Sequence, residues 1–231
     1  YNSAVHYTAM HSLGMLYIAG LIKLVYAKNK VTTGLLLVLS MLGALVVGGV
    51  NNVTVLQVLL VMLSIIGFGV IFKKYRVFLL LPALAFYGFG MYKNLSSPGN
   101  AHRMLAYVNM RLSVPEAILK SFQSAFSYLD EFTGWMTLAI VVFMIPVVIY
   151  IVKKTDFGFA YPGLILAWSI CLYATGFTPT LYTMGHTLLG RATNMAKVTF
   201  QLLLFINLFY LLGWICKKMQ KQNRTVHINS T

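Results

Sequence analysis

A polar segment at positions 96–103, Ser-Ser-Pro-Gly-Asn-Ala-His-Arg, interrupts an otherwise apolar chain of 231 residues. The proline and glycine at its centre predict a turn, because proline fixes φ and glycine tolerates positive φ. After the turn, Arg103 offers a planar fork of donors that matches phosphate oxygens, and His102 adds a titratable donor. With Asn100, they are candidate ligands for a lipid phosphate. The alternative is an ordinary loop whose arginine extends to the membrane headgroups.

A second segment, residues 178–194, carries the same types of side chain. His186 and Arg191 lie near the start of the last apolar run, and Gly190 leaves space for a ligand or another backbone. An arginine and a histidine in each of two segments favour a shared site for an anion, with His186 and Arg191 as further candidates. The alternative is an interfacial loop whose arginine only sets the topology.

Only four acidic residues are available as general bases. A glycosyl or acyl transfer needs a base near the acceptor hydroxyl, and Asp130 and Glu131 are the candidates, together with Glu116. The favoured alternative is that Asp130 and Glu131 mark the water-exposed end of a helix, because adjacent residues point in different directions. His6 and His11 do not share a helix face, so no metal site is predicted. A divalent cation stays open as a cofactor.

The composition is that of an integral membrane protein. The mean hydropathy is +0.78, and only 10% of the residues are charged, too few for the surface of a soluble domain. A span needs about 20 mainly apolar residues. We predict an all-α fold, a polytopic transmembrane bundle in a single domain (residues 1–231), expected to be the C-terminal part of a longer protein. The seven predicted spans are 6–27, 32–50, 54–72, 77–92, 134–152, 159–177 and 193–216.

Basic residues outnumber acidic ones by 18 to 4, which gives a net charge of +14. They fall mainly between the apolar runs, which indicates contact with anionic membrane lipids and not with nucleic acid. In a seven-span arrangement they share one side of the cell membrane. That side is predicted to be the cytoplasm, so the chain starts outside and its C-terminal tail lies inside. These residues are Lys28, Lys30, Lys73, Lys74, Arg76, Lys153, Lys154, Lys217, Lys218, Lys221 and Arg224.

The long outer connection, residues 93–133, is predicted to contain a helix that lies flat on the membrane. Ser113 and Glu116 have the spacing of a capping box. Apolar and polar residues then recur on opposite faces at helical spacing, which is typical of an interfacial helix. The predicted apolar face is Ile118, Leu119, Phe122, Ala125, Phe126 and Leu129, and the polar face is Glu116, Lys120, Gln123, Ser124 and Ser127.

Motifs of several familiar classes are absent from the sequence. It has no Walker loop, GxSxG, HExxH or CxxC, so a nucleotide-driven pump or a common hydrolase gains no support. Seven spans with an outer start also fit a G-protein-coupled receptor. The Asp-Arg-Tyr and Asn-Pro-Xaa-Xaa-Tyr motifs of that class are missing, which argues against it.

Three short motifs are similar to those of a group of bacterial polytopic membrane proteins that resemble glycosyltransferases of the GT-C type. The motifs are His6-Tyr7-Thr8, Ser97-Pro98-Gly99-Asn100 with Arg103, and Gly190-Arg191 with Asn194. GT-C enzymes take sugars from polyprenyl-phosphate carriers on the outer leaflet. The resemblance implies that Asn100, Arg103 and Arg191 contact the carrier phosphate or the sugar. The catalytic acid of the first outer loop has no counterpart here, which implies a base upstream of Tyr1.

The leading hypothesis is therefore a membrane glycosyltransferase-like protein of cell-surface glycan assembly, with a polyprenyl-phosphate-linked sugar as its donor. One alternative is a transporter or flippase for a lipid-linked or anionic solute, in which the same arginines hold the cargo. Another is a non-catalytic subunit bound to a membrane-protein partner.

Overall fold

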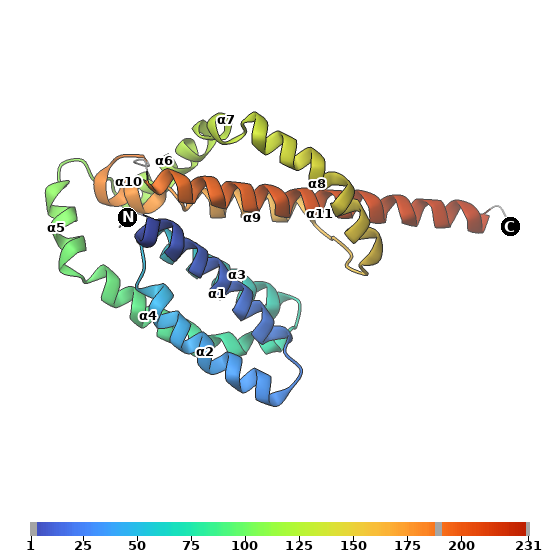
Figure 1. Cartoon of the computed structure of the whole chain (residues 1–231), viewed down its shortest axis with the longest axis horizontal. Coiled ribbons are helices and arrows are strands. Elements are labelled where there is room, and N and C mark those ends of the chain that lie inside the picture. Colours follow the sequence, from blue (N-terminus) through green and yellow to red (C-terminus); the bar gives the residue numbers. More distant parts are fainter. Residues whose placement is uncertain (1–3, 188–190, 230–231) are drawn as a thin grey trace. The chain divides into compact units, whose positions relative to one another are not determined.

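The computed structural model describes residues 4–187 and 191–229, which form helices and their connections without a β-strand (Figure 1). The all-α fold predicted from the sequence is confirmed. The chain divides into two compact units. Unit 1 comprises Tyr1–Phe122 and Ala174–Met195, and unit 2 comprises Gln123–Tyr173 and Ala196–Thr231.

Unit 1 is built on four apolar helices, α1 to α4, which alternate in direction along the chain (Figure 1). Shorter helices follow them or lead into them. The elements are η1 (Ala4–Ala9), α1 (Met10–Tyr26), α2 (Lys30–Gly48), α3 (Asn52–Ile71), η2 (Tyr75–Leu80), α4 (Leu81–Leu95), α5 (Pro98–Ala106), the start of α6 (Val114–Ser127) and α10 (Thr178–Met184).

The alternation gives unit 1 two ends of different composition. One end holds the connections 27–29 and 72–74, and we call it the basic end because its charged residues are Lys28, Lys30, Lys73, Lys74 and Arg76. The opposite end holds α5, the segment 107–112 and α10, and we call it the α5 end. The two ends are separated by the length of the apolar helices.

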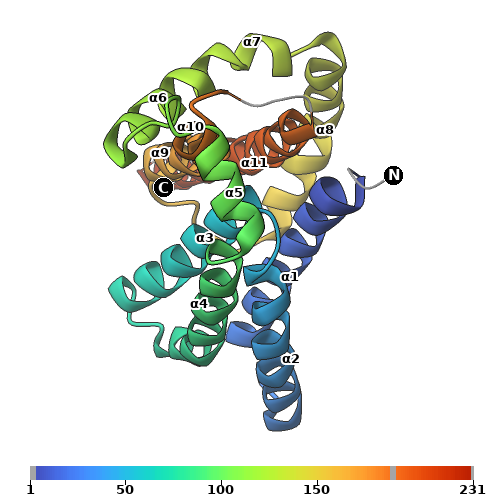
Figure 2. The same ribbon diagram turned by 90° about the vertical axis from the view of Figure 1, so that its left-hand side faces the viewer.

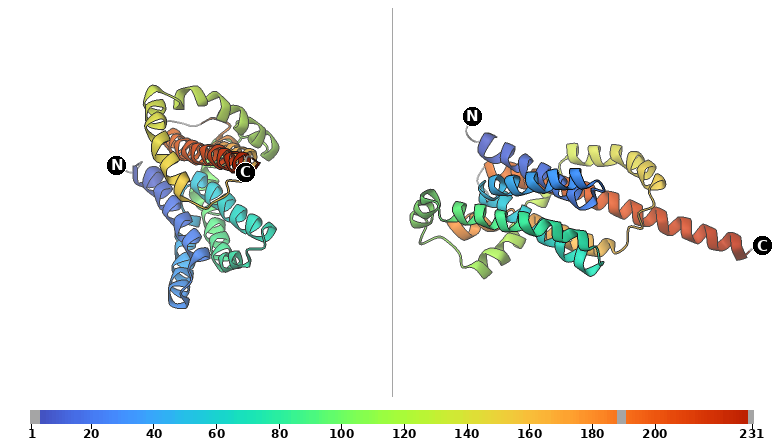
Figure 3. Two further views of the ribbon diagram at one scale, coloured as in Figure 1. Left: turned by 90° about the vertical axis from the view of Figure 1, so that its right-hand side faces the viewer. Right: turned by 90° about the horizontal axis from the view of Figure 1, so that it is seen from below.

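Unit 2 consists mainly of the helices in the second half of the chain. They are the end of α6, α7 (Leu129–Phe132), α8 (Trp135–Lys154), α9 (Pro162–Ala174) and most of α11 (Arg191–Asn229). α11 runs as one continuous helix of 39 residues (Figure 3).

Within the described parts of the chain, seven helical stretches are long and apolar enough to cross a membrane, which confirms the number predicted from the sequence. The sixth differs most from the prediction, because helix resumes at α10 where an outer loop was expected. The stretches are Tyr7–Tyr26, Lys30–Gly48, Asn52–Ile71, Tyr75–Leu95, Trp135–Lys154, Pro162–Met184 and Ala192–Lys221.

Two buried tyrosines connect all four long helices of unit 1. Tyr17 of α1 and Tyr87 of α4 stack with their ring centroids 6.4 Å apart. The Tyr17 hydroxyl donates to the carbonyl of Ser40 on α2 (3.0 Å), and the Tyr87 hydroxyl donates to that of Val55 on α3 (2.8 Å). Lipid offers no water to replace such partners, so these bonds favour one arrangement of the helices.

α2 packs most extensively against α4, and two glycines allow the close approach. A Cβ added at Gly90 would lie 2.8 Å from the carbonyl oxygen of Leu45 and 3.3 Å from Cα of Gly48. One added at Gly48 would lie 2.7 Å from the carbonyl oxygen of Tyr87. Helices in lipid associate through close packing and not through the hydrophobic effect, so small residues at a contact are favoured.

In unit 2, the connection between α8 and α9 (residues 155–161) packs on α11. Phe159 is 1% exposed, and its ring centroid lies 5.4 Å from that of Phe209 and 5.5 Å from that of Tyr210. A Cβ added at Gly213 would lie 2.5 Å from the Phe159 ring. The glycine therefore provides the space into which this aromatic side chain fits.

α6 confirms the helix predicted in the long connection, but its faces differ from the prediction. The carboxylate of Glu116 accepts from the Ser113 backbone N–H (3.0 Å) and hydroxyl (2.7 Å), which is one half of a capping box. The buried side chains are small, and two of them are serines: Ala117, Ser121, Ser124 and Ala125. The large apolar side chains Ile118, Leu119 and Phe126 are exposed and available to lipid. That α6 lies flat on a membrane stays a prediction.

Glu116→Gln is expected to destabilise the protein at neutral pH, and the difference is expected to vanish once the pH has fallen below the folded-state pKa of Glu116. The hydroxyl and N–H of Ser113, with Lys120 nearby, hold the pKa of Glu116 below its ordinary value of 4.5. A lowered pKa stabilises the fold above the ordinary value, and that contribution is lost as the pH falls through the folded-state pKa. Thermal unfolding in detergent at a series of pH values measures the difference.

Asp130→Asn is the control for this experiment, since it removes the same charge from another exposed acid. A destabilisation by Glu116→Gln that stays constant with pH would contradict the ionic contribution of this cap.

Candidate functional site

The polar segment that the sequence predicts as a turn is the first part of a helix. Pro98 is the first residue of α5, where its missing N–H is not needed, and Gly99 does not have a positive φ. The prediction of a turn at these two residues is therefore wrong. The helix places His102 and Arg103 in its middle, and both side chains are exposed.

Asn100 holds α5 in place. Its side-chain amide donates to the backbone carbonyl of Asn94 (2.7 Å) and lies 3.5 Å from the Asn94 side-chain oxygen. The amide of Asn94 in turn donates to the carbonyl of Val50 (2.7 Å) and to the side-chain oxygen of Asn52 (3.0 Å). This asparagine chain ties the start of α5 to the adjacent ends of α2, α3 and α4. Asn100 thus has a structural role that the sequence did not indicate.

The two segments that carry the candidate residues meet in unit 1. α5 lies next to α10, and α10 lies next to α3 (Figure 2). The ring of Tyr107, just after α5, is edge-on to that of His186, with centroids 6.4 Å apart. The backbone N–H of Leu112 donates to the carbonyl of Leu181 (3.4 Å). The segment of Arg103 and that of His186 are therefore neighbours in unit 1, and a shared anion site formed by their side chains stays a prediction.

Gly185 makes this junction possible. It ends α10 with a left-handed conformation, φ +68°, which costs an L-residue about 1–2 kcal/mol. The backbone carbonyl of Met110 occupies the place that a Cβ at Gly185 would need. The residue at this position must therefore be glycine for segment 107–112 to lie against α10.

The side chains exposed at the α5 end are cationic or neutral. Arg103 and Arg111 are exposed, as are His102 and His186. The one acid of unit 1 is Glu116, whose carboxylate accepts two hydrogen bonds from Ser113. This arrangement suits an anion, because guanidinium groups bind phosphate oxygens with two parallel hydrogen bonds.

Two of the predicted site residues lie partly or wholly outside the described residues. Arg191 begins α11, but its side chain is outside the part that the structure describes, and so is Gly190. A role for Arg191 in phosphate binding stays a prediction.

Two of the three candidate bases belong to the other unit, whereas Glu116 belongs to unit 1. Asp130 and Glu131 lie in the short helix α7 of unit 2, and both are exposed. Their role as bases stays a prediction. Among the side chains that the structure describes (residues 7–187 and 192–221), no three His, Cys, Asp or Glu gather closely enough to hold a metal ion.

A buried polar contact inside unit 1 was missed by the sequence reasoning. His11 of α1 is 2% exposed, and its Nδ1 lies 3.2 Å from the hydroxyl of Thr54 on α3, which is fully buried. Gln57, one turn further along α3, is also buried. Polar residues within spans usually face the bundle interior, so the positions of these three side chains within apolar runs were an available signal.

Comparison of the chain with protein-family models, curated proteins and solved structures gives no match.

Proposed function

We propose that the α5 end of unit 1 binds the phosphate of a polyprenyl-phosphate-linked sugar, and that the chain takes part in glycosyl transfer to a cell-surface glycan. The observation that carries the proposal is the junction of α5 with α10, which places the segment of the exposed Arg103 next to that of the exposed His186, although the two are far apart in the sequence. The resemblance of the sequence motifs to those of GT-C enzymes is the reason for proposing a polyprenyl-phosphate-linked sugar as the ligand.

The chemistry of the site supports phosphate as the group that is bound. When a sugar leaves its carrier, negative charge develops on the departing phosphate, and fixed cationic donors stabilise it. Arg103 and Arg111 offer such donors, and the asparagine chain fixes the helix that carries Arg103. The chain's own contribution to the reaction is then to hold and neutralise the phosphate.

The distribution of charge supports an outer location for the α5 end. The basic end of unit 1 lies at the other end of the spans, and short basic connections are retained in the cytoplasm. In this orientation the N-terminus lies outside and the tail of α11 lies inside, as the sequence predicted.

Arg103→Ala is expected to weaken binding of a short-chain polyprenyl phosphate about tenfold or more, since a hydrogen bond to a charged group contributes about 1.5–3 kcal/mol. It is also expected to abolish transfer in membranes at an unchanged protein level. Native mass spectrometry of the purified protein measures the binding, and incorporation of labelled sugar into glycan measures the transfer.

Lys120→Ala is the matched control, because it removes one exposed positive charge outside the α5 end. Normal binding and normal transfer by the Arg103→Ala protein would contradict the proposal. An equal loss of binding in the Lys120→Ala protein would show that net positive charge, and not the position of Arg103, determines phosphate binding.

The second candidate function is a transporter or flippase for a lipid-linked anion, and His11 is the observation that favours it. Buried ionisable side chains within spans are typical of ion and substrate pathways. His11→Gln distinguishes the two functions: it is expected to leave glycosyl transfer intact if the chain is a transferase and to stop lipid translocation in liposomes if the chain is a transporter.

A further inference from the structure

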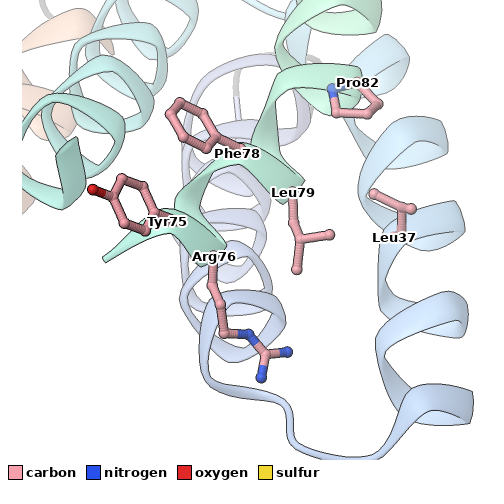
Figure 4. Close-up of a pocket in the computed structure, with 6 residues that line it drawn as sticks. All are labelled: Leu37, Tyr75, Arg76, Phe78, Leu79 and Pro82. Atoms are coloured by element: carbon pink, nitrogen blue, oxygen red, sulfur yellow. The ribbon is translucent and has the colours of Figure 1, made fainter. Parts of the chain in front are cut away.

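The basic end of unit 1 contains an apolar groove of about 500 Å³ between α2 and the segment formed by η2 and the start of α4. Figure 4 shows Leu37 of α2 facing Leu79 across it, with Arg76 directed toward the loop between α1 and α2. The volume is within the range of ligand sites, roughly 300–1,000 Å³. The remaining lining residues are Tyr75, Phe78 and Pro82.

Arg76 is exposed at the groove and makes a hydrogen bond to the end of α1. Its guanidinium donates to the carbonyl of Ala27 at the end of α1. A guanidinium has five N–H donors, so further donors remain for a ligand. Tyr75 and Phe78 stack with ring centroids 6.3 Å apart, which stabilises the wall of the groove next to this arginine.

The positive charge at the basic end has no acidic partner in the helices around it. The first 115 residues of the chain contain no Asp or Glu, so the four helices carry no carboxylate. The cations Lys28, Lys30, Lys73, Lys74 and Arg76 therefore need counter-ions from outside the bundle. At the end of a transmembrane helix, the nearest anions are lipid headgroups.

We propose that this groove holds one anionic phospholipid, with an acyl chain between Leu37 and Leu79 and the headgroup phosphate at Arg76. An apolar groove with an exposed arginine at its side matches a molecule that has an apolar chain joined to a phosphate. The site is separate from the α5 end and does not depend on the function proposed there.

The test is lipid retention by the full chain in detergent, measured by native mass spectrometry after incubation with phosphatidylglycerol or phosphatidylcholine. One phosphatidylglycerol is expected to be retained in preference to phosphatidylcholine. Arg76→Gln is expected to reduce this retention about tenfold, as for loss of a charge-assisted hydrogen bond. Leu37→Trp, which fills the groove without changing the charge, is expected to reduce it as well.

Lys153→Gln is the matched control, because it removes one charge from the end of α8 in unit 2. Glycerol 3-phosphate, which has the phosphate but no chain, is expected not to displace the lipid. Thermal unfolding checks that each variant is folded. Retention that is unchanged in both groove variants, or lost equally in the Lys153→Gln protein, would overturn the proposal.

Discussion

Gly185→Ala is expected to abolish polyprenyl-phosphate binding at the α5 end while leaving the α1–α4 bundle folded. Two costs act together at this position. The φ of +68° is unfavourable for alanine, and the new Cβ would meet the backbone carbonyl of Met110. The carbonyl of Met110 belongs to the backbone and cannot rotate away as the end of a flexible side chain could. Segment 107–112 must therefore move away from α10. The contact between Tyr107 and His186 is then lost.

Gly99→Ala is the control for this variant. Gly99 also lies at the α5 end, but a Cβ there has no neighbour within 4 Å, and its φ is not positive. Binding by native mass spectrometry should fall by more than about tenfold for Gly185→Ala and stay unchanged for Gly99→Ala. Thermal unfolding should show that both proteins are folded, with a lower melting temperature only for Gly185→Ala, because of the backbone strain at position 185. Unimpaired binding by the Gly185→Ala protein would show that the junction with α10 is not needed.

Gly90→Ala is expected to separate α2 from α4 and to cause the largest loss of stability among the substitutions considered. The added Cβ would meet the carbonyl oxygen of Leu45 and Cα of Gly48, which are backbone atoms that cannot rotate away. Overpacking of a well-packed core costs about 1–3 kcal/mol. The hydrogen bond from Tyr87, on the same helix, would be strained by the same displacement.

Gly88→Ala provides the comparison on the same helix, because a Cβ at Gly88 has no neighbour within 4 Å. Alanine favours helix over glycine by about 1 kcal/mol, so Gly88→Ala should be neutral or slightly stabilising in a thermal melt. The Gly90→Ala protein should melt at a clearly lower temperature. If the two variants melted alike, the close contact of α2 with α4 would not contribute to stability.

The features predicted correctly from the sequence are those that depend on local composition. A span is recognisable because each of its residues must be tolerated by lipid, whatever its neighbours are, and the number of spans is confirmed. The hydrogen bonds between Ser113 and Glu116 are equally local, since the two residues are only three positions apart in the sequence. These properties require no knowledge of which helices touch.

The features that the sequence did not predict depend on contacts between distant segments. Pro98 was read as a turn, although proline is also favoured at the first position of a helix, and the asparagine chain through Asn94 then fixes that helix. The amide of Asn100 donates to the Asn94 carbonyl, a contact that the sequence does not predict, and its role in ligand binding stays a prediction. The burial of His11 depends on the packing of α1 against α3. The pattern of residue types along one sequence does not show which distant helices contact each other.

The packing of Phe159 on α11 has a consequence for the order in which unit 2 folds. Phe159 lies in the connection between the stretches Trp135–Lys154 and Pro162–Met184, and its side chain is 1% exposed. The surface on which Phe159 packs, around Gly213, belongs to α11, the last helix in the sequence. The connection can therefore reach its packed position only after α11, the last helix in the sequence, has been synthesised.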